Sequence, residues 1–194
     1  MTIVLIDADA FLSARRLGVV ELLVSNAGTW PKPTLRCTAI IGRNELNDVQ
    51  DDVARLEALG LLEIVPVYAK TPEARKKREL QEKLRVHKGE AEAIAWGALR
   101  VRQASERVIF VSHDSAARRA ASKSSLESWD LFDLAKHWLD QGWLDIKRFK
   151  AVFESWEEDP KTLGRPQNFS SVEETFRKRF GTTLDAWIAS PDDV

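Results

Sequence analysis

The sequence predicts an α/β protein with three layers, α/β/α, built around a central parallel sheet and followed by a helical C-terminal extension. Short apolar runs rich in Val, Ile and Leu recur between residues 3 and 111, and such runs are typical of strands buried on both faces. Segments with helical spacing separate these runs, an alternation that favours a parallel sheet covered by helices. Beyond residue 145 the helical patterns continue without a strand pattern.

The elements of the first half follow from apolar periodicity and from Gly and Pro punctuation. Leu46, Val49, Val53, Leu56 and Leu59 share one helical face, and Gly60 ends that helix. In order, we predict a strand over residues 3–6, a helical segment over 10–27 broken at Gly18, a loop over 29–34, a strand over 35–41, a helix over 44–59, a strand over 61–67, and a charged helix within 71–88 ending in a turn at Lys88-Gly89.

The second half begins with an alanine-rich helical pattern and a second uninterrupted apolar run. We predict a helix over residues 90–101, a strand over 108–111, a helix over 114–121, a short strand over 126–130 and a helix over 131–139. The change in character near residue 145 predicts two domains. The first covers residues 1–145, and the second, over 146–194, is an acidic, tryptophan-bearing helical extension.

Composition excludes several kinds of site. The chain of 194 residues has 44% hydrophobic residues and a net charge of -1, which describes a globular protein without an overall basic character. A single cysteine excludes an intrachain disulfide and a cysteine-based zinc site. The apolar run before Asp7 has only four residues, too short for a signal peptide or a membrane helix. We therefore expect a cytoplasmic protein that does not bind membranes.

Acidic residues stand where a parallel sheet presents its ligand-binding edge. Asp7 directly follows the first strand and Asp114 closely follows the strand over 108–111. The carboxyl ends of parallel strands share one edge of the sheet, so both side chains are expected there. Glu45 and Glu90 begin predicted helices that can reach the same edge, with Glu92 close behind. Each glutamate alone is also explained as a helix cap, since acids are favoured at helix N-termini.

Converging carboxylates repel one another, and a hard divalent cation removes that repulsion. Mg²⁺ and Mn²⁺ prefer oxygen ligands in octahedral geometry. The acidic set therefore predicts a Mg²⁺ (or Mn²⁺) site. A metal bound in this way can activate water for attack on a phosphodiester.

Four motifs contain these acidic residues. They are IDADAF over residues 6–11, RNEL over 43–46, GEAEAI over 89–94 and VSHDSAARRA over 111–120. Together they resemble the PIN-domain family, over about residues 1–143. The Gly-Glu-x-Glu-Ala-Ile helix start and the Asp followed by Ala-Arg-Arg-x-Ala are the most specific of them. Asp9 and His113 differ from the residues that many members carry at these places.

The resemblance implies a metal-dependent endoribonuclease, in many members the toxin of a type II toxin–antitoxin pair. RNA would be the substrate, a small antitoxin protein would silence the enzyme, and the chain would form a homodimer. The implied catalytic set is Asp7, Glu45, Glu90 and Asp114. The implied metal-binding set is Asp7, Asp9, Glu90 and Asp114. In this set, Asp9 would be a ligand or would orient a metal-bound water. Additional site residues would be Glu92, Ser112, His113 and Arg118, with Arg118 touching a phosphate.

Two further features have more than one interpretation. Residues 70–88 carry eight basic and three acidic side chains, which suit either an RNA backbone or a solvated helix face. His113 beside Asp114 is explained either by catalysis or by structural hydrogen bonding.

Two rival functions remain open. Asp7-Ala8-Asp9 after a strand also resembles the Asp-x-Asp motif of haloacid-dehalogenase-like Mg²⁺-dependent phosphatases, although the Lys and the strand-borne Gly-Asp pair of that family are not found here. A PIN-like fold can also serve as a binding or assembly module without catalysis. The intact acidic set favours the nuclease.

Overall fold

The computed structural model describes residues 2–104, 106–162, 164–166 and 168–189 of the chain. The chain divides into two compact units, Met1–Leu134 and Ala135–Val194, which we call the N-terminal unit and the C-terminal unit. The division falls within helix α7 (Leu131–Asp140). The domain boundary at residue 145 stays a prediction.

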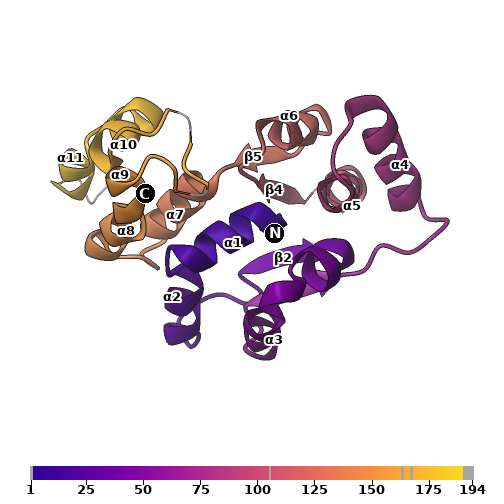
Figure 1. Cartoon of the computed structure of the whole chain (residues 1–194), viewed down its shortest axis with the longest axis horizontal. Coiled ribbons are helices and arrows are strands. Elements are labelled where there is room, and N and C mark those ends of the chain that lie inside the picture. Colours follow the sequence, from indigo (N-terminus) through magenta and orange to yellow (C-terminus); the bar gives the residue numbers. More distant parts are fainter. Residues whose placement is uncertain (1, 105, 163, 167, 190–194) are drawn as a thin grey trace. The chain divides into compact units, whose positions relative to one another are not determined.

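The N-terminal unit contains a five-stranded sheet in the order β3-β2-β1-β4-β5, and every pair of neighbouring strands is parallel. This confirms the predicted α/β fold with a central parallel sheet (Figure 1). The strands are β1 (Thr2–Ile6), β2 (Leu35–Thr38), β3 (Leu62–Val65), β4 (Arg107–Val111) and β5 (Glu127–Trp129).

The two apolar runs that the sequence analysis singled out form neighbouring central strands. In both β1 and β4, every residue after the first is buried. Their backbones pair in register from Thr2 opposite Arg107 to Ile6 opposite Val111. A strand buried on both faces accepts a continuous apolar sequence, so the fold and the sequence agree here.

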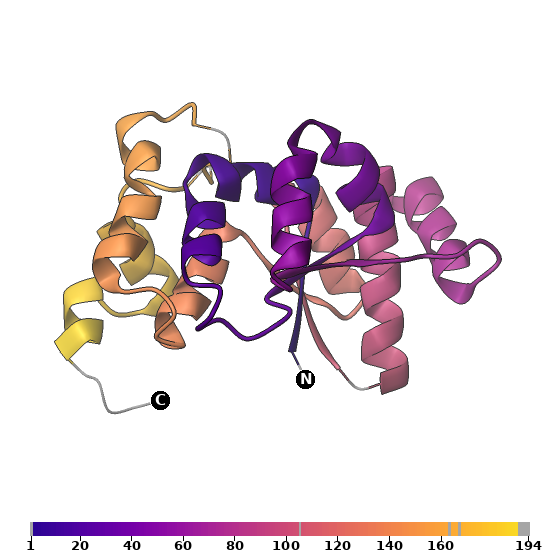
Figure 2. The same cartoon turned by 90° about the horizontal axis from the view of Figure 1, so that it is seen from below.

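Helices cover both faces of the sheet. Right-handed crossovers place the helices between β1 and β3 on one face and those between β3 and β5 on the other, as Figure 1 shows. α4 packs against α5, and Figure 2 shows this pair from below. The helices up to β5 are α1 (Ala8–Arg16), α2 (Val19–Ser25), α3 (Gln50–Ala58), α4 (Pro72–Leu84), α5 (Lys88–Ala104) and α6 (Ser115–Lys123).

The structure corrects two details of the predicted elements. The expected helix over 44–59 is three pieces: the π-helical turn η1 (Ile41–Glu45), the 3₁₀ turn η2 (Asn47–Val49) and α3. Apolar spacing alone does not distinguish these helix types. Lys88 and Gly89 do not form a turn after a helix, because they are the first residues of α5.

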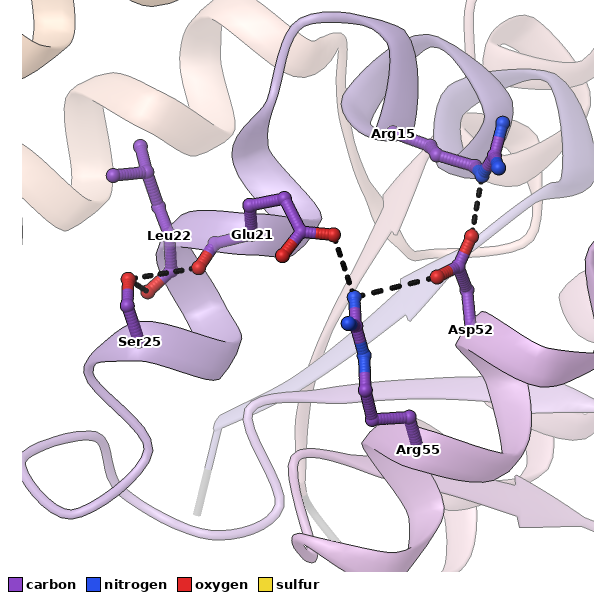
Figure 3. A network of polar contacts seen from close by, with 6 residues as sticks. All are labelled: Arg15, Glu21, Leu22, Ser25, Asp52 and Arg55. Carbon is purple, nitrogen blue, oxygen red and sulfur yellow. Dashed lines mark hydrogen bonds and ion pairs between the residues drawn. The ribbon is translucent and has the colours of Figure 1, made fainter.

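A network of ion pairs connects the three helices on one face of the sheet (Figure 3). Arg55 of α3 contacts Glu21 of α2, with 2.6 Å between guanidinium and carboxylate. Asp52 of α3 pairs with both Arg55 and Arg15, the latter on α1. Exposed pairs of this kind contribute little individually, so the network mainly fixes how the ends of these helices are oriented.

The C-terminal unit is helical in its described residues, as predicted. Its core is a cluster of aromatic rings, in which Phe153 lies 4.7 Å from Trp156 and Phe149 lies 6.0 Å from Phe176, measured between ring centroids. Among the described residues of the whole chain, no helix is both long and apolar enough to cross a membrane. The helices after α7 are α8 (Ile146–Val152), α9 (Glu154–Glu158), α10 (Val172–Phe180) and α11 (Leu184–Ala189).

Candidate active site

The carboxyl ends of β1 and β4 meet at the centre of the sheet. From β1 the chain continues to β2 and β3 on one side, whereas β4 and β5 lie on the other side. In open parallel sheets, ligands bind at the point where the connections diverge in this way. Ile6 pairs with Val111, and the next residues along these strands are Asp7 and Ser112. Asp7 was predicted to lie at the ligand edge of the sheet, and it lies at the centre of that edge.

Asp7 is a buried carboxylate at the start of α1. Its backbone N–H donates to the Val111 carbonyl at 3.0 Å, which continues the β1–β4 pairing by one residue. Its Oδ1 accepts a hydrogen bond from the Ala10 amide at 2.7 Å and so caps the helix. Only 2% of the residue is exposed. Burial raises the pKa of Asp7 to about 7, although hydrogen bonds from Ser112 and Ala10 oppose this shift.

Ser112 connects Asp7 to Asp114. Its hydroxyl donates to the Asp7 carboxylate, and its Oγ accepts a hydrogen bond from the Asp114 amide at 3.0 Å. Asp114 in turn caps α6 by accepting hydrogen bonds from the Ala116 and Ala117 amides. One fully buried hydroxyl therefore ties together the two strand ends that carry the predicted aspartates.

We expect Ser112→Ala to raise the pKa of Asp7 above its value of about 7, because the variant loses a hydrogen bond that favours the carboxylate. The Asp114 amide also loses its acceptor, so stability should fall by about 1–3 kcal/mol. Carbon-detected NMR titration of the aspartate carboxyls and urea denaturation measure the two effects. Ser122→Ala is the control, since its hydroxyl contacts Ser128 at an exposed position. An unchanged Asp7 titration would show that Ser112 does not donate to it.

Glu45 is brought to the site by the π-helical turn η1. Gln50 Nε2 donates to the carbonyls of Gly42 at 2.7 Å and Leu46 at 3.0 Å, which satisfies acceptors that this irregular turn leaves open. Gly42 leaves the space that the turn needs, because a Cβ there would lie 2.6 Å from Cδ1 of Ile64. The Glu45 carboxylate then reaches the start of α5, where Oε1 accepts a hydrogen bond from the Gly89 amide at 3.1 Å.

The start of α5 is shaped by a glycine. A Cβ at Gly89 would lie 2.3 to 2.5 Å from the carboxylate of Glu45, so only glycine allows this approach. Glu90 folds back and accepts a hydrogen bond from the His87 amide at 3.2 Å, as the glutamate of a capping box does. Two carboxylates, those of Glu45 and Glu90, thus share the positive end of one helix dipole.

Four of the predicted residues line one cavity of about 360 Å³. They are joined there by residues that the sequence analysis did not assign to the site. The predicted residues are Asp7, Asp9, Glu45 and Glu90, and the additional ones are Ala8, Leu12 and His87.

The carboxylates around this cavity interact unfavourably. Burial raises the pKa of Glu90, and the charges of Asp114 and Asp9 raise it further. Burial also raises the pKa of Glu45, and the charge of Asp9 adds to that effect. The charge of His87 lowers the pKa of both glutamates. Asp114 does not line the cavity, yet its charge connects it to the cluster through Glu90. Five carboxylates are therefore close enough to repel one another.

Glu92 is held by other partners. It is buried, one oxygen accepts a hydrogen bond from the Ile40 amide at 3.0 Å, and the other pairs with Lys77 at 2.7 Å. Glu92 thereby joins α4 and the segment before η1 to α5. These contacts favour a supporting role over its predicted place among the additional site residues.

His113 lies in the connection from β4 to α6, and Arg118 lies in the first turn of α6. Arg118 Nη1 donates to the Ser112 carbonyl at 2.6 Å, which steadies the segment carrying Asp114. Burial lowers the pKa of His113, while the charge of Asp130 opposes that shift. Neither side chain lines the acidic cavity. The structure thus places these two residues beside the site and gives Arg118 a structural contact.

The donor set suits a hard divalent cation, because all of the clustered groups are carboxylates that repel one another. In the described part of the chain, however, no three His, Cys, Asp or Glu side chains lie in the arrangement of a preformed metal site. Asp7, Glu45, Glu90 and Asp114 instead accept hydrogen bonds from backbone amides at helix starts. Binding a metal would require Asp7, Asp9, Glu90 and Asp114 to turn toward a common point.

Sequence reasoning missed His87, Gly89 and Gln50 as contributors. His87 was noted only as one of three scattered histidines, and its signal was its place directly before the GEAEAI motif. Gly89 belonged to that motif, but the reason why it must lack a Cβ is its contact with Glu45, which lies 44 positions away in the sequence. Gln50 gave no signal, because its role depends on the π-helical turn.

Comparison with known proteins finds no relative of this chain. No model of a protein family matches this chain, and no curated protein and no solved structure matches it either.

Proposed function

We propose that this protein is a metal-dependent endoribonuclease that hydrolyses RNA phosphodiester bonds at the acidic cavity. One observation carries the proposal: four carboxylates line a single cavity at the centre of the sheet's ligand edge, and a fifth is electrostatically connected to them. Such a cluster is costly unless protons or a cation neutralise it. The four sequence motifs that resemble the PIN-domain family add the substrate class.

The proposed roles follow from where each side chain lies. Asp7, Asp9, Glu90 and Asp114 would hold Mg²⁺ or Mn²⁺, which when bound supplies an activated water and stabilises charge on phosphate oxygens. Glu45 has a pKa raised by burial, which suits a group that takes a proton from the attacking water. Ser112 and the Gly89 amide would keep Asp7 and Glu45 oriented.

The test is cleavage of labelled RNA, both single-stranded and structured, with Mn²⁺ and with a chelator, by the full chain and by Asp114→Asn. Asparagine caps helices about as well as aspartate, so this substitution keeps the start of α6 and removes only the charge. We expect cleavage that requires the metal and is lost in Asp114→Asn. Asp145→Asn is the matched control, because Asp145 caps α8 in the same way, and it should retain the activity.

The same experiment separates the rival functions. Hydrolysis of a phosphate monoester without RNA cleavage would identify a phosphatase that uses Asp7. Absence of both activities in a folded protein would favour a binding module. Cleavage that survives Asp114→Asn would contradict the proposed site.

The partners implied by the family resemblance are part of the proposal. As the toxin of a type II pair, the protein would be silenced by a small antitoxin and would form a homodimer. Light scattering of the purified chain measures its oligomeric state. Growth arrest upon expression, abolished by Asp114→Asn, would support a toxin, whereas unaffected growth would argue against it.

A further inference from the structure

A second cavity lies on the N-terminal unit, on the face of the sheet that carries α4, α5 and α6. Its volume is about 530 Å³, and it opens between α4, the C-terminal half of α5 and the turn that follows α6. Figure 1 shows these three helices next to one another. We call this cavity the α4–α6 groove, and its lining includes Arg75, Lys76, Glu79, Leu99, Arg102 and Ser124.

The groove has a basic rim. Arg75 and Arg102 are exposed, and within the described ranges neither forms an ion pair. Lys76 pairs with Glu79 at 3.5 Å, and Glu79 also pairs with Lys83 at 3.2 Å, so this single carboxylate does not neutralise the rim. Two guanidinium groups, contributed by different helices, are therefore left to attract an anion.

The rest of the lining suits an extended, partly apolar ligand. The lining includes the apolar side chains of Ala98, Leu99 and Val101 from α5 and of Pro72 from α4. Ser124 and Ser125 add hydroxyl groups. A lining that combines cations, hydroxyl groups and apolar side chains fits a chain of sugars and phosphates better than it fits a small inorganic anion.

The structure also sorts the basic segment over residues 70–88. Lys77 points into the fold and pairs with the buried Glu92, and Lys83 pairs with Glu79 on its own helix. Lys77 is therefore accounted for by folding, whereas the Lys83 pair is an exposed contact within one helix. Arg75 differs from them because it combines with Arg102, a residue far outside the segment, across the groove.

We propose that the α4–α6 groove binds the sugar–phosphate backbone of single-stranded RNA. This inference rests on the proposed nuclease function, because α5 connects the groove to the acidic cavity. Glu90 and Ala98 both lie on α5, and at about 1.5 Å per residue they are about 12 Å apart along its axis. Four nucleotides cover about 14 Å in a stacked strand. A strand bound at the groove can thus place a phosphodiester bond at the acidic cavity.

The test measures binding separately from cleavage. A fluorescein-labelled single-stranded RNA of about 12 nucleotides is titrated with Asp114→Asn protein in a chelator, and anisotropy reports the Kd. Adding Arg75→Ala and Arg102→Ala should weaken binding about tenfold at about 0.1 M salt and lower the salt dependence, the slope of log K against log salt, by about 1.4. Arg16→Ala with Arg177→Ala is the control pair, because both arginines are exposed and lie outside the groove, and it should leave binding unchanged.

Competition identifies the occupant. Unlabelled poly-uridine should displace the probe, whereas poly-glutamate at equal charge should not. Displacement by poly-glutamate alone would assign the groove to an acidic polypeptide and overturn the proposal. Equal Kd values for the groove variant and the control pair would overturn it as well.

The outcomes also separate the groove from the nuclease. If the groove variant loses RNA binding but the unaltered chain cleaves no RNA with Mn²⁺, the proposed function fails and the groove stands. If the unaltered chain cleaves RNA and the groove variant binds RNA normally, the groove fails and the nuclease stands.

Discussion

Asp7→Asn should make the metal-free protein more stable at pH 8, by at most about 4 kcal/mol. Asp7 is 2% exposed, and burial raises its pKa from 3.8 to about 7. At pH 8 the folded protein therefore holds a charge that water would solvate far better. Asparagine removes the charge, and its amide can still accept from the Ala10 N–H and contact Ser112.

The sign of this stability change follows from the protonation state of Asp7 at each pH. Below pH 3.8 Asp7 is protonated in the folded and the unfolded chain. Between 3.8 and about 7 only the unfolded chain ionises, so stability falls as pH rises and the loss is complete above 7. At about 1.4 kcal/mol per pH unit, this interval corresponds to the limit of about 4 kcal/mol. The advantage of Asp7→Asn should thus be absent near pH 4 and complete near pH 8.

Urea denaturation in a chelator at several pH values measures this effect. Asp145→Asn is the control, since the Asp145 side chain is 62% exposed and its charge stays solvated. A variant that is less stable than the unaltered chain at pH 8 would show that the Asp7 charge is well compensated. If the proposed metal site includes the Asp7 carboxylate, added Mn²⁺ should reverse the order at pH 8, because the chain with Asp7 would gain the binding energy of the metal.

Gly89→Ala should reduce metal-dependent cleavage by about a hundredfold while changing stability by less than about 1 kcal/mol. The added Cβ would lie 2.3 Å from one Glu45 oxygen, so the carboxylate must leave the start of α5. Because that carboxylate ends a flexible side chain, it can move without disturbing the backbone. The loss should therefore fall on the site and not on the fold.

Gly97→Ala on the same helix provides the matched control. A Cβ there would lie 2.8 Å from Leu126 and 3.0 Å from both Leu5 and Val108, all packed in the core. It should cost about 1–3 kcal/mol of stability through overpacking. Glu45→Asp combined with Gly89→Ala should recover part of the cleavage, because the shorter side chain makes room. A Gly89→Ala protein with full cleavage would exclude Glu45 from the reaction.

The sequence was most informative where one sequence pattern indicates both the local structure and the place of a candidate site residue. β1 and β4 are continuous apolar runs, and parallel strands must align at one edge, so Asp7 could be placed at the ligand edge without a structure. Asp114 follows by the same reasoning, since it caps the next helix. The presence of Glu90 at this edge was also predictable, as it stands at a helix start. Glu45 was expected there for the same reason, but it is the last residue of η1 and not the start of a helix.

Long-range contacts and irregular backbone were not predictable in the same way. Glu92 belongs to the same motif as Glu90 and has the same charge, yet its two oxygens contact Lys77 and the Ile40 amide. One regular helix was expected over 44–59, where the chain instead ends η1 and forms η2 and α3, since apolar residues such as Leu46 and Val49 satisfy either geometry. His87 reaches the cavity only because α5 begins one residue after it.

Because of the π-helical turn, the position of Glu45 depends more on how many residues the turn contains than on which residues they are. A π-helical turn contains about one residue more than an α-helical turn. Removing one residue between Gly42 and Glu45 would convert the turn to an α-helical one, in which the bond from the Leu46 amide to the Ile41 carbonyl spans four residues instead of five. The Glu45 carboxylate would then lose the wider turn from which it reaches the Gly89 amide. Point substitutions of Arg43 and Asn44, both exposed, should therefore be tolerated in evolution, whereas a single-residue deletion there should be selected against.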